Sequence, residues 1–313
     1  MKNNIMPTPL AFGVDLGGTN LRVALVSQEG KILSERRART PIEEGPVATA
    51  ELMNRLARDQ LAPSLANHRV LGIGVGSPGP LSRAEKTIFQ TPNLPGFDNF
   101  PLGKRVEELL GMPLWLDNDA KCATFGEAKF GAARGKRNVI LLTFGTGIGG
   151  GVLADGRMIY GKSDGACELG HLTLHPEGRP CKCGNRGCFE VYVSATAVER
   201  RAIETAGRKV SNLELFQAEA RGDSWATSCL VEIARDLAIG CASLVNIFEP
   251  EMIVFGGGLF SGGGGPLCSM VQENIRDRCF KSSQRGLEIV PSTLLGEAGV
   301  LGAASLVFDN HTT

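Results

Sequence analysis

The sequence lacks any apolar run long enough to cross a lipid bilayer. A spanning helix needs about 20 consecutive apolar residues, and runs such as 139–142 stop far short of that length. The apolar part of the start of the chain is too short for a signal peptide, and Asp15 follows at once. We therefore predict no transmembrane helix and expect a cytoplasmic protein.

The sequence also lacks an excess of charge of either sign. Its 33 Lys and Arg residues cancel its 33 Asp and Glu residues. A neutral chain gives no electrostatic reason to bind nucleic acid or an anionic membrane, so we expect neither as a partner. Any anionic ligand must instead be held by a local arrangement of groups.

The length and composition indicate a globular protein with many tight loops. A chain of 313 residues is about twice the usual size of one domain, which favours two domains, although one large α/β unit is also possible. Glycine accounts for 41 residues, well above the usual frequency of roughly 7%. Because the glycines fall in clusters, we expect them to form tight loops.

Hydrophobic periodicity predicts strands that alternate with helices. Runs of β-branched and aliphatic residues predict strands at 10–14, 21–26, around Ile32, 70–75, 114–117 and 252–255. Apolar residues at spacings of three and four predict helices at 47–61, 102–110, 120–130, 225–248 and 297–308. Strands alternate with helices throughout, so the fold class is α/β.

One pattern occurs twice. Residues 12–23 have the design of a strand, a turn rich in Gly and Thr, and a second strand, and residues 138–153 repeat it. Each half of the chain is therefore predicted to open with a similar hairpin.

The turns of these hairpins suit a bound phosphate. Glycine lets backbone N–H groups approach an oxyanion, and the Thr hydroxyl adds a donor. A single Gly-rich hairpin needs no ligand, but two of them can hold one phosphate chain from opposite sides. A third loop, 256–258, either contacts the nucleotide or is a plain exit from a strand. The residues assigned to a nucleotide are Gly17, Gly18, Thr19, Asn20, Gly145, Thr146, Gly147, Gly256, Gly257 and Gly258.

The glycine loops do not match the common nucleotide motifs. Neither hairpin contains the Gly-x-x-x-x-Gly-Lys-Ser/Thr pattern of a P-loop. A dinucleotide-binding fingerprint opens a helix. Gly145-x-Gly-x-x-Gly150 is followed by strand-like residues, so it does not match this motif.

Two carboxylates stand where phosphoryl transfer needs them. Asp119 lies where a predicted strand ends and a predicted helix begins, and transfer to an alcohol needs a carboxylate that takes the hydroxyl proton. The alternative is that Asp119 only caps the helix. Asp15 precedes the first glycine loop and suits the metal and water shell of the phosphates, because Mg²⁺ takes only one or two carboxylates.

Cysteine and histidine cluster in one segment. Three of the nine cysteines, Cys181, Cys183 and Cys188, lie within eight residues, and His171 precedes them. One His and three Cys make a closed tetrahedral zinc set, and such a metal would be structural. The alternative is four unrelated residues. The other six cysteines are predicted to be small buried hydrophobic residues.

Seven motifs resemble, in order, those of the ROK family of sugar kinases and repressors. They are Asp15-Leu-Gly-Gly-Thr-Asn, Asn93-Leu-Pro-Gly, Asp117-Asn-Asp-Ala, Phe144-Gly-Thr-Gly-Ile-Gly-Gly-Gly, Glu168-Leu-Gly-His, Cys181-x-Cys-Gly-x-x-Gly-Cys-x-Glu190 and Val254-Phe-Gly-Gly-Gly. The resemblance implies the actin-like, ribonuclease H-like ATPase fold, with two domains around a central cleft for sugar and ATP. We expect a small first domain of residues 1–118 plus a final helix at about 297–313. The large second domain, 119–296, would carry the zinc-binding loop.

The resemblance also assigns roles to residues. The catalytic base falls on Asp119, and the sugar contacts fall on Gly79, Asn93, Asn118, Asp119, Glu168, His171 and Glu190. A metal on His171 and the three cysteines would orient Glu168 and Glu190 without touching the phosphates. Many members have Lys where this chain has Asn20, and Arg22 on the same strand face could compensate for its charge.

Within the family, residues 117–197 look most like those of ATP-dependent glucokinases. This implies phosphorylation of glucose to glucose 6-phosphate with ATP and Mg²⁺, in carbohydrate metabolism, by a homo-oligomer, expected to be a dimer. Another hexose, such as mannose, fructose or an N-acetylhexosamine, is the first alternative. The second is a sugar-responsive repressor, which would need a helix-turn-helix domain, and only fourteen residues precede Asp15.

Overall fold

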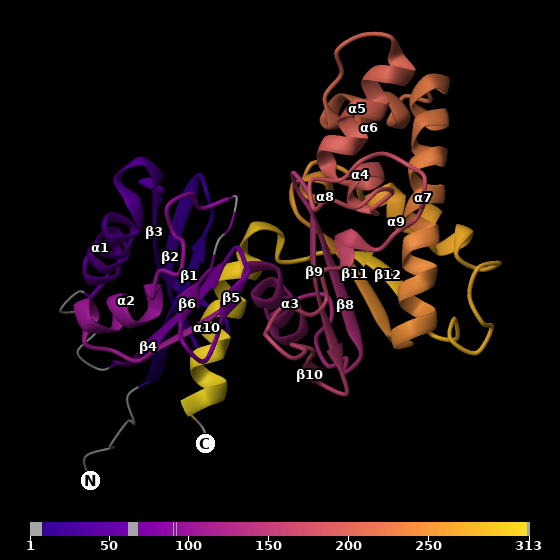
Figure 1. Cartoon of the computed structure of the whole chain (residues 1–313). Helices are drawn as coiled ribbons and strands as arrows, with labels where there is room; N and C mark the ends of the chain where they lie inside the picture. Colours follow the sequence, from indigo (N-terminus) through magenta and orange to yellow (C-terminus); the bar gives the residue numbers. More distant parts are fainter. Residues whose placement is uncertain (1–7, 62–67, 90, 92, 312–313) are drawn as a thin grey trace. The chain divides into compact units, whose positions relative to one another are not determined.

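The computed structural model describes residues 8–61, 68–89, 91 and 93–311. Its contacts divide the chain into two units, each built around a five-stranded sheet (Figure 1). The first unit contains the described residues up to Phe130, the segment Tyr160–Ala166 and the described residues from Glu297 onward. The second contains Gly131–Ile159 and Cys167–Gly296. Among the described residues, no helix is both long enough and apolar enough to cross a membrane.

The sheet of the first unit has the strand order β3-β2-β1-β4-β7. Its strands are β1 (Thr8–Leu16), β2 (Asn20–Ser27), β3 (Ile32–Arg39), β4 (His68–Ser77) and β7 (Leu114–Asn118). β1, β2 and β3 are antiparallel neighbours, whereas β4 runs parallel to β1 and β7 parallel to β4. All five predicted strands of this half are confirmed. A separate two-stranded sheet consists of β5 (Leu81–Ser82) and β6 (Thr87–Ile88).

The two faces of this sheet are covered by different helices. Leu10, Phe12, Val14 and Leu16 alternate along β1 and are fully buried in one core with α1 (Gly45–Arg58) and α2 (Leu102–Leu110). The alternate residue Gly13 faces α10 (Ala298–His311). The predicted helices at 47–61 and 297–308 are confirmed with shifted ends, because α1 stops at Arg58 and α10 starts at Ala298.

Glycines allow α10 to lie directly on the sheet and on α3 (Asp119–Phe130). A Cβ at Gly74 of β4 would lie 1.8 Å from the carbonyl oxygen of Ala303, and one at Gly302 would lie 1.6 Å from that of Cys122. Neither position can accept a larger residue unless a helix moves. Because α3 packs so closely on α10, it belongs to the first unit. The first unit therefore extends to Phe130, whereas the sequence led us to expect a boundary after residue 118.

The sheet of the second unit repeats the plan of the first. Its order is β10-β9-β8-β11-β12, with β8 (Val139–Phe144), β9 (Ile148–Ala154), β10 (Arg157–Met158), β11 (Met252–Gly256) and β12 (Glu288–Pro291). A hairpin leads from the central strand to one side, and parallel strands lie on the other side. The repeated hairpin predicted from the sequence is confirmed, as is the α/β class.

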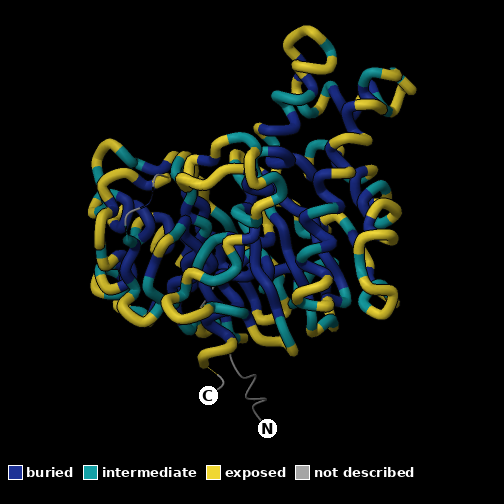
Figure 2. Tube along the Cα trace, turned by 45° about the vertical axis from the view of Figure 1, so that its right-hand side comes forward, coloured by how far each residue is buried: buried dark blue, intermediate teal, exposed yellow. Residues whose placement is uncertain are grey.

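The helices of the second unit centre on α7 (Ser224–Phe248), the predicted long core helix. It shares one core with the sheet and with α9 (Gly265–Asn274). The other elements are α4 (Glu190–Val193), α5 (Ala195–Ala206), α6 (Asn212–Ala220) and α8 (Gly258–Ser261). Short 3₁₀ turns occur at η1 (Ile42–Glu44), η3 (Leu169–His171) and η4 (Leu295–Glu297). Figure 2 shows that buried residues follow the inner strands, while many connecting loops are exposed.

Candidate active site

The first glycine loop is a tight turn between β1 and β2. The N–H of Gly17 donates to the carbonyl oxygen of Asn20 at 2.9 Å. The buried Thr40 donates its N–H to the carbonyl oxygen of Thr19 at 2.9 Å and its hydroxyl to that of Gly17 at 2.7 Å. These bonds occupy the carbonyl groups of the loop and fix its shape.

Asn93 lies against this loop. A Cβ at Gly18 would be 2.4 Å from the carbonyl oxygen of Asn93, so the two backbones touch. Gly18, Thr19 and Asn93 border a cavity of about 510 Å³ within the first unit. Arg39, which pairs with Asn20 across β2 and β3, lines the same cavity and was not singled out from the sequence. The first predicted phosphate loop and one predicted sugar contact are therefore neighbours.

Asp15 lies near the end of β1, beside the first turn of α10. A Cβ at Gly299 would be 3.2 Å from Oδ2 of Asp15. Burial raises the pKa of Asp15, and the positive charge of Arg22 opposes this shift. The Arg22 guanidinium itself is nearly buried and lies 2.6 Å from the carboxylate of Glu35. Its charge is thus paired with Glu35, and whether Arg22 compensates for the lysine that many family members have at position 20 stays a prediction.

Asn118 is the residue that caps α3. Its side-chain oxygen accepts hydrogen bonds from the N–H groups of Ala120 at 3.0 Å and Lys121 at 3.2 Å. Asp119 is the first residue of the helix, and its Oδ1 accepts from the N–H of Ala120 at 2.8 Å. The amide nitrogen of Asn118 lies 3.7 Å from the Cβ position of Gly79. Asn118 is thus the N-cap of α3, Asp119 also accepts from an N–H of the first turn, and three predicted sugar contacts lie close together.

Asp117, at the end of β7, is almost completely buried and strongly bonded. Its Oδ2 accepts a hydrogen bond from the hydroxyl of Tyr160 at 2.5 Å and lies 3.4 Å from Nε of Arg83. Its Oδ1 accepts from the N–H of Asn118 at 2.7 Å. Burial raises the pKa of Asp117, while the Tyr160 hydrogen bond and the charge of Arg83 lower it. Burial, followed by the charge of Asp117, raises the pKa of Tyr160. Neither Arg83 nor Tyr160 was predicted from the sequence, because neither lies in a recognisable motif.

The second glycine loop joins β8 and β9 and lies beside the loop that follows β11. A Cβ at Gly257 would be 2.6 Å from the backbone of Phe144, the last residue of β8. Gly257 also has a φ of 83°, which favours glycine. The carbonyl oxygen of Gly145 accepts from the N–H of Ala195 at 3.0 Å. Within the second unit, the two predicted nucleotide loops are thus brought together.

Glu190 connects the second glycine loop to the cysteine segment. Its Oε2 accepts a hydrogen bond from the N–H of Ile148 at 3.3 Å. The same oxygen lies only 2.5 Å from the position that a Cβ at Gly147 would take. Its Oε1 accepts from the thiol of Cys181 at 3.1 Å and lies 3.9 Å from Nδ1 of His171. Through Glu190 the cysteine segment is therefore connected to the second glycine loop.

Glu168 and His171 are positioned by one short turn. Glu168 is exposed and immediately precedes η3, and its carbonyl oxygen accepts from the N–H of His171 at 3.0 Å. A Cβ at Gly170 would be 2.3 Å from the carbonyl oxygen of Ile148. This contact holds η3, which Glu168 precedes and His171 ends, directly on Ile148, the residue that also donates to Glu190.

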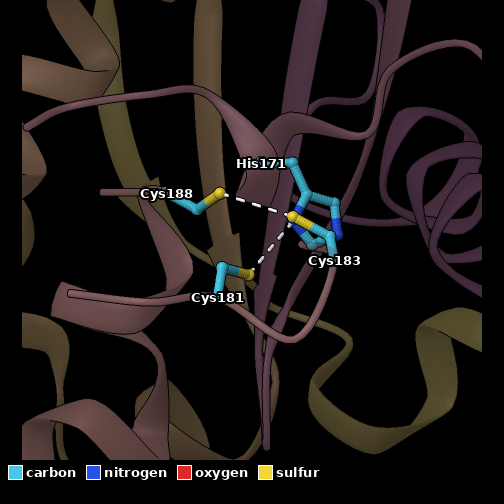
Figure 3. A group of neighbouring side chains, drawn as sticks. All are labelled: His171, Cys181, Cys183 and Cys188. Carbon is cyan, nitrogen blue, oxygen red and sulfur yellow. Dashed lines mark hydrogen bonds between the residues drawn. The ribbon is translucent and has the colours of Figure 1, made fainter. Parts of the chain in front are cut away.

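His171, Cys181, Cys183 and Cys188 form a compact cluster (Figure 3). Their ligand atoms all lie within 4.8 Å of one another. The sulfurs of Cys183 and Cys188 are 3.6 Å apart, and Sγ of Cys181 is 3.7 Å from Nδ1 of His171. Two ligands at 2.3 Å from one zinc ion and at a tetrahedral angle are about 3.8 Å apart. The donor set and these separations both fit zinc.

The comparison with known families decides the relationship. The sequence profile described as the ROK family matches residues 11–310, nearly the whole chain. The chain belongs to the ROK family. A relative named glucokinase, from Thermotoga maritima, is 36% identical over 96% of this chain and 98% of its own length. Proteins named xylose repressor also match, over 77 to 78% of their own lengths.

Solved structures of ROK proteins share the fold. The ROK hexokinase of Thermus thermophilus superposes with a TM-score of 0.84 and 36% identity, covering 97% of this chain and 99% of that one. The ROK family glucokinase of Streptomyces griseus, in complex with glucose and AMPPNP, gives a TM-score of 0.80 and 30% identity, covering 96% and 99%. The expected actin-like ATPase fold is confirmed.

Proposed function

We propose that this ROK protein transfers the terminal phosphoryl group of ATP to glucose, giving glucose 6-phosphate and ADP. The observation that carries the proposal is the start of α3. Because Asn118 accepts from the N–H groups of both Ala120 and Lys121, the helix does not depend on the bond from Ala120 to Asp119 for its cap. A carboxylate at that place, beside Asn118 and Gly79, suits a general base for an alcohol.

The proposed roles follow the chemistry of each group. Asp119 takes the proton of the attacking sugar hydroxyl on a carboxylate oxygen. Carboxylates and amides can orient the other hydroxyls in pairs, which is the role proposed for Asn93, Asn118, Glu168 and Glu190. The backbone of Gly79 and the ring of His171 are proposed as further sugar contacts. Nδ1 of His171 faces Cys181, so Nε2 is the ring nitrogen proposed for the sugar.

The nucleotide is proposed to bind through backbone N–H groups of the glycine loops. These are Gly17–Asn20 in the first unit and Gly145–Gly147 with Gly256–Gly258 in the second. Mg²⁺ would offset the negative charge of the phosphates, and Asp15 is the carboxylate proposed to hold its water shell. A cation suits Asp15, because burial alone disfavours its charged form.

Zinc is proposed as the structural metal of the second unit, held by His171, Cys181, Cys183 and Cys188. The support is the four-residue donor set and its separations. With all four positions filled by protein, the ion would hold the loop and not bind substrate. Through Glu190 this loop supports both a proposed sugar contact and the second glycine hairpin.

The test is an assay of ADP release with ATP, Mg²⁺ and a panel of sugars. We expect the highest kcat/KM with glucose, and lower values with mannose, fructose, N-acetylglucosamine and N-acetylmannosamine. A tenfold higher value with another sugar would reassign the substrate and keep the kinase. Absence of ADP release with every sugar would contradict the kinase itself. The expected dimer stays a prediction, which light scattering coupled to size-exclusion chromatography tests.

A further inference from the structure

The segment Tyr160–Ala166 has an unusual place in the chain. It belongs to the first unit, whereas the residues before it, up to Ile159, and after it, from Cys167, belong to the second. Its two ends meet, because the N–H of Ala166 donates to the carbonyl oxygen of Tyr160 at 3.0 Å. We call it the 160–166 loop. Glu168, a proposed sugar contact, is only two residues beyond its end.

The hydroxyl of Tyr160 is the main attachment of this loop. It donates to Oδ2 of Asp117 at 2.5 Å, across 43 residues of sequence. The guanidinium carbon of Arg83 lies 3.6 Å from the centre of the Tyr160 ring, a cation–π contact. Ring and hydroxyl are therefore both engaged by residues of the first unit.

Asp164 provides a second attachment. Its carbonyl oxygen accepts a hydrogen bond from Nζ of Lys121 at 2.6 Å, and its carboxylate accepts from the N–H of Arg83 at 3.0 Å. Lys121 lies on α3, two residues after Asp119, and is buried. A buried ammonium group needs such a partner, so the loop is also tied to the helix that begins with Asp119.

Asp117 transmits this anchoring to the proposed sugar site. One carboxylate oxygen accepts from Tyr160 and the other from the N–H of Asn118. Because Asp117 is only 1% exposed, these partners fix its orientation. The peptide group bonded to Asp117 leads directly into Asn118 and Asp119.

We propose that Tyr160 is a positioning residue for phosphoryl transfer, which holds the Asn118–Asp119 turn through Asp117 and links this turn to Glu168 through the 160–166 loop. The inference rests on the proposed function. Tyr160 acts through Asp117 and needs no contact with the substrate. An error of about 1 Å in the placement of a catalytic group can cost about 100-fold in rate.

Tyr160→Phe removes the hydroxyl and keeps the ring that stacks on Arg83. We expect kcat with glucose to fall about tenfold or more, the KM for glucose to rise, and the KM for ATP to change less than about twofold. Asp117 would also lose a hydrogen bond that lowers its pKa. The acid limb of the kcat profile should therefore move to higher pH, while the charges of Arg83 and Lys121 still lower the pKa of Asp117.

The chain offers a matched control, because it contains only one other tyrosine, Tyr192. Its hydroxyl accepts from the N–H of Arg179 at 2.9 Å, and both residues belong to the second unit. Tyr192→Phe removes one buried hydroxyl in the same way and should leave the acid limb in place. A combined Tyr160→Phe and Asp117→Asn variant should be slower than Asp117→Asn alone by no more than about twofold, because both changes break one interaction.

The outcomes separate the two claims. If the wild-type protein phosphorylates no hexose, the proposed function fails and this inference falls with it. If the wild type is active and Tyr160→Phe keeps its kcat and pH profile, only the inference is overturned. The inference is also overturned if Tyr160→Phe lowers kcat without moving the acid limb, and if the double variant with Asp117→Asn shows the product of the two single losses in kcat. Tyr160 would then act independently of Asp117. Should Tyr160→Phe fold poorly, the same measurements are made on Lys121→Met, which removes one of the two hydrogen bonds to Asp164. An unchanged glucose KM in this variant overturns the linkage to Glu168.

Discussion

The carboxylate of Glu190 accepts a hydrogen bond from the backbone N–H of Ile148 at 3.3 Å, in the second glycine hairpin. Its other oxygen accepts from the thiol of Cys181 at 3.1 Å. One side chain thus connects the proposed zinc loop to a proposed phosphate loop. Loss of the metal should therefore affect the nucleotide as well as the sugar.

Removal of a cysteine ligand tests this connection. We expect about one zinc per chain in purified protein. Cys183→Ser should lose the metal and raise the KM values for both glucose and ATP, because Glu190 would lose its support on one side. Elemental analysis and steady-state kinetics measure both effects, with Cys279→Ser, outside the cluster, as the control. Fully active protein without zinc would refute the structural metal.

The contact between Gly18 and Asn93 gives a second prediction. A methyl group at residue 18 would lie 2.4 Å from the carbonyl oxygen of Asn93, so Gly18→Ala must displace one of the two backbones. We expect the KM values for ATP and glucose to rise together, by about tenfold. Gly265→Ala, at a position with no atom within 4 Å of its Cβ, is the matched control. Unchanged kinetics in Gly18→Ala would mean that the loop is not part of the site.

The pKa of Asp15 predicts a pH-dependent cost in stability. Because burial raises this pKa in the folded protein, the ionised carboxylate disfavours folding. The cost is absent below the unfolded pKa, about 3.9, and grows as pH rises through the folded value. In Mg²⁺-free buffer at pH 7, Asp15→Asn should therefore melt about 2 °C or more above the wild type. Melting curves from pH 4 to pH 8 should show this difference shrinking toward pH 4, and a difference of opposite sign would contradict it.

Local sequence predicted the parts of the fold that depend on short-range pattern. The hairpins at β1–β2 and β8–β9, and the long apolar helix α7, follow from the spacing of their apolar residues and glycines. The boundary of the first unit could not be read in this way. It depends on the contact between Gly302 and the backbone of Cys122, which joins residues far apart in the sequence.

In the candidate site too, features that depend on neighbouring residues could be predicted, whereas features that depend on distant contacts could not. The cluster of His171 with the three cysteines was visible because its members are close in sequence, and the structure brings their ligand atoms together. The role of Tyr160 could not be predicted from the sequence. Its partner Asp117 is 43 residues away, and a single tyrosine forms no motif with its sequence neighbours. The capping of α3 by Asn118 was also undecided, since adjacent Asn and Asp residues can both serve as caps.

The measurement that tests the account most directly is the kcat of Asp119→Asn with glucose, ATP and Mg²⁺. The amide keeps the shape of the carboxylate and an oxygen for the hydrogen bond from Ala120, but it cannot take a proton. We predict a fall in kcat of about 10² to 10⁴, with glucose affinity by calorimetry nearly unchanged and with exposed Asp277→Asn equal to the wild type. A variant that kept more than about a tenth of the wild-type kcat would exclude Asp119 as the general base.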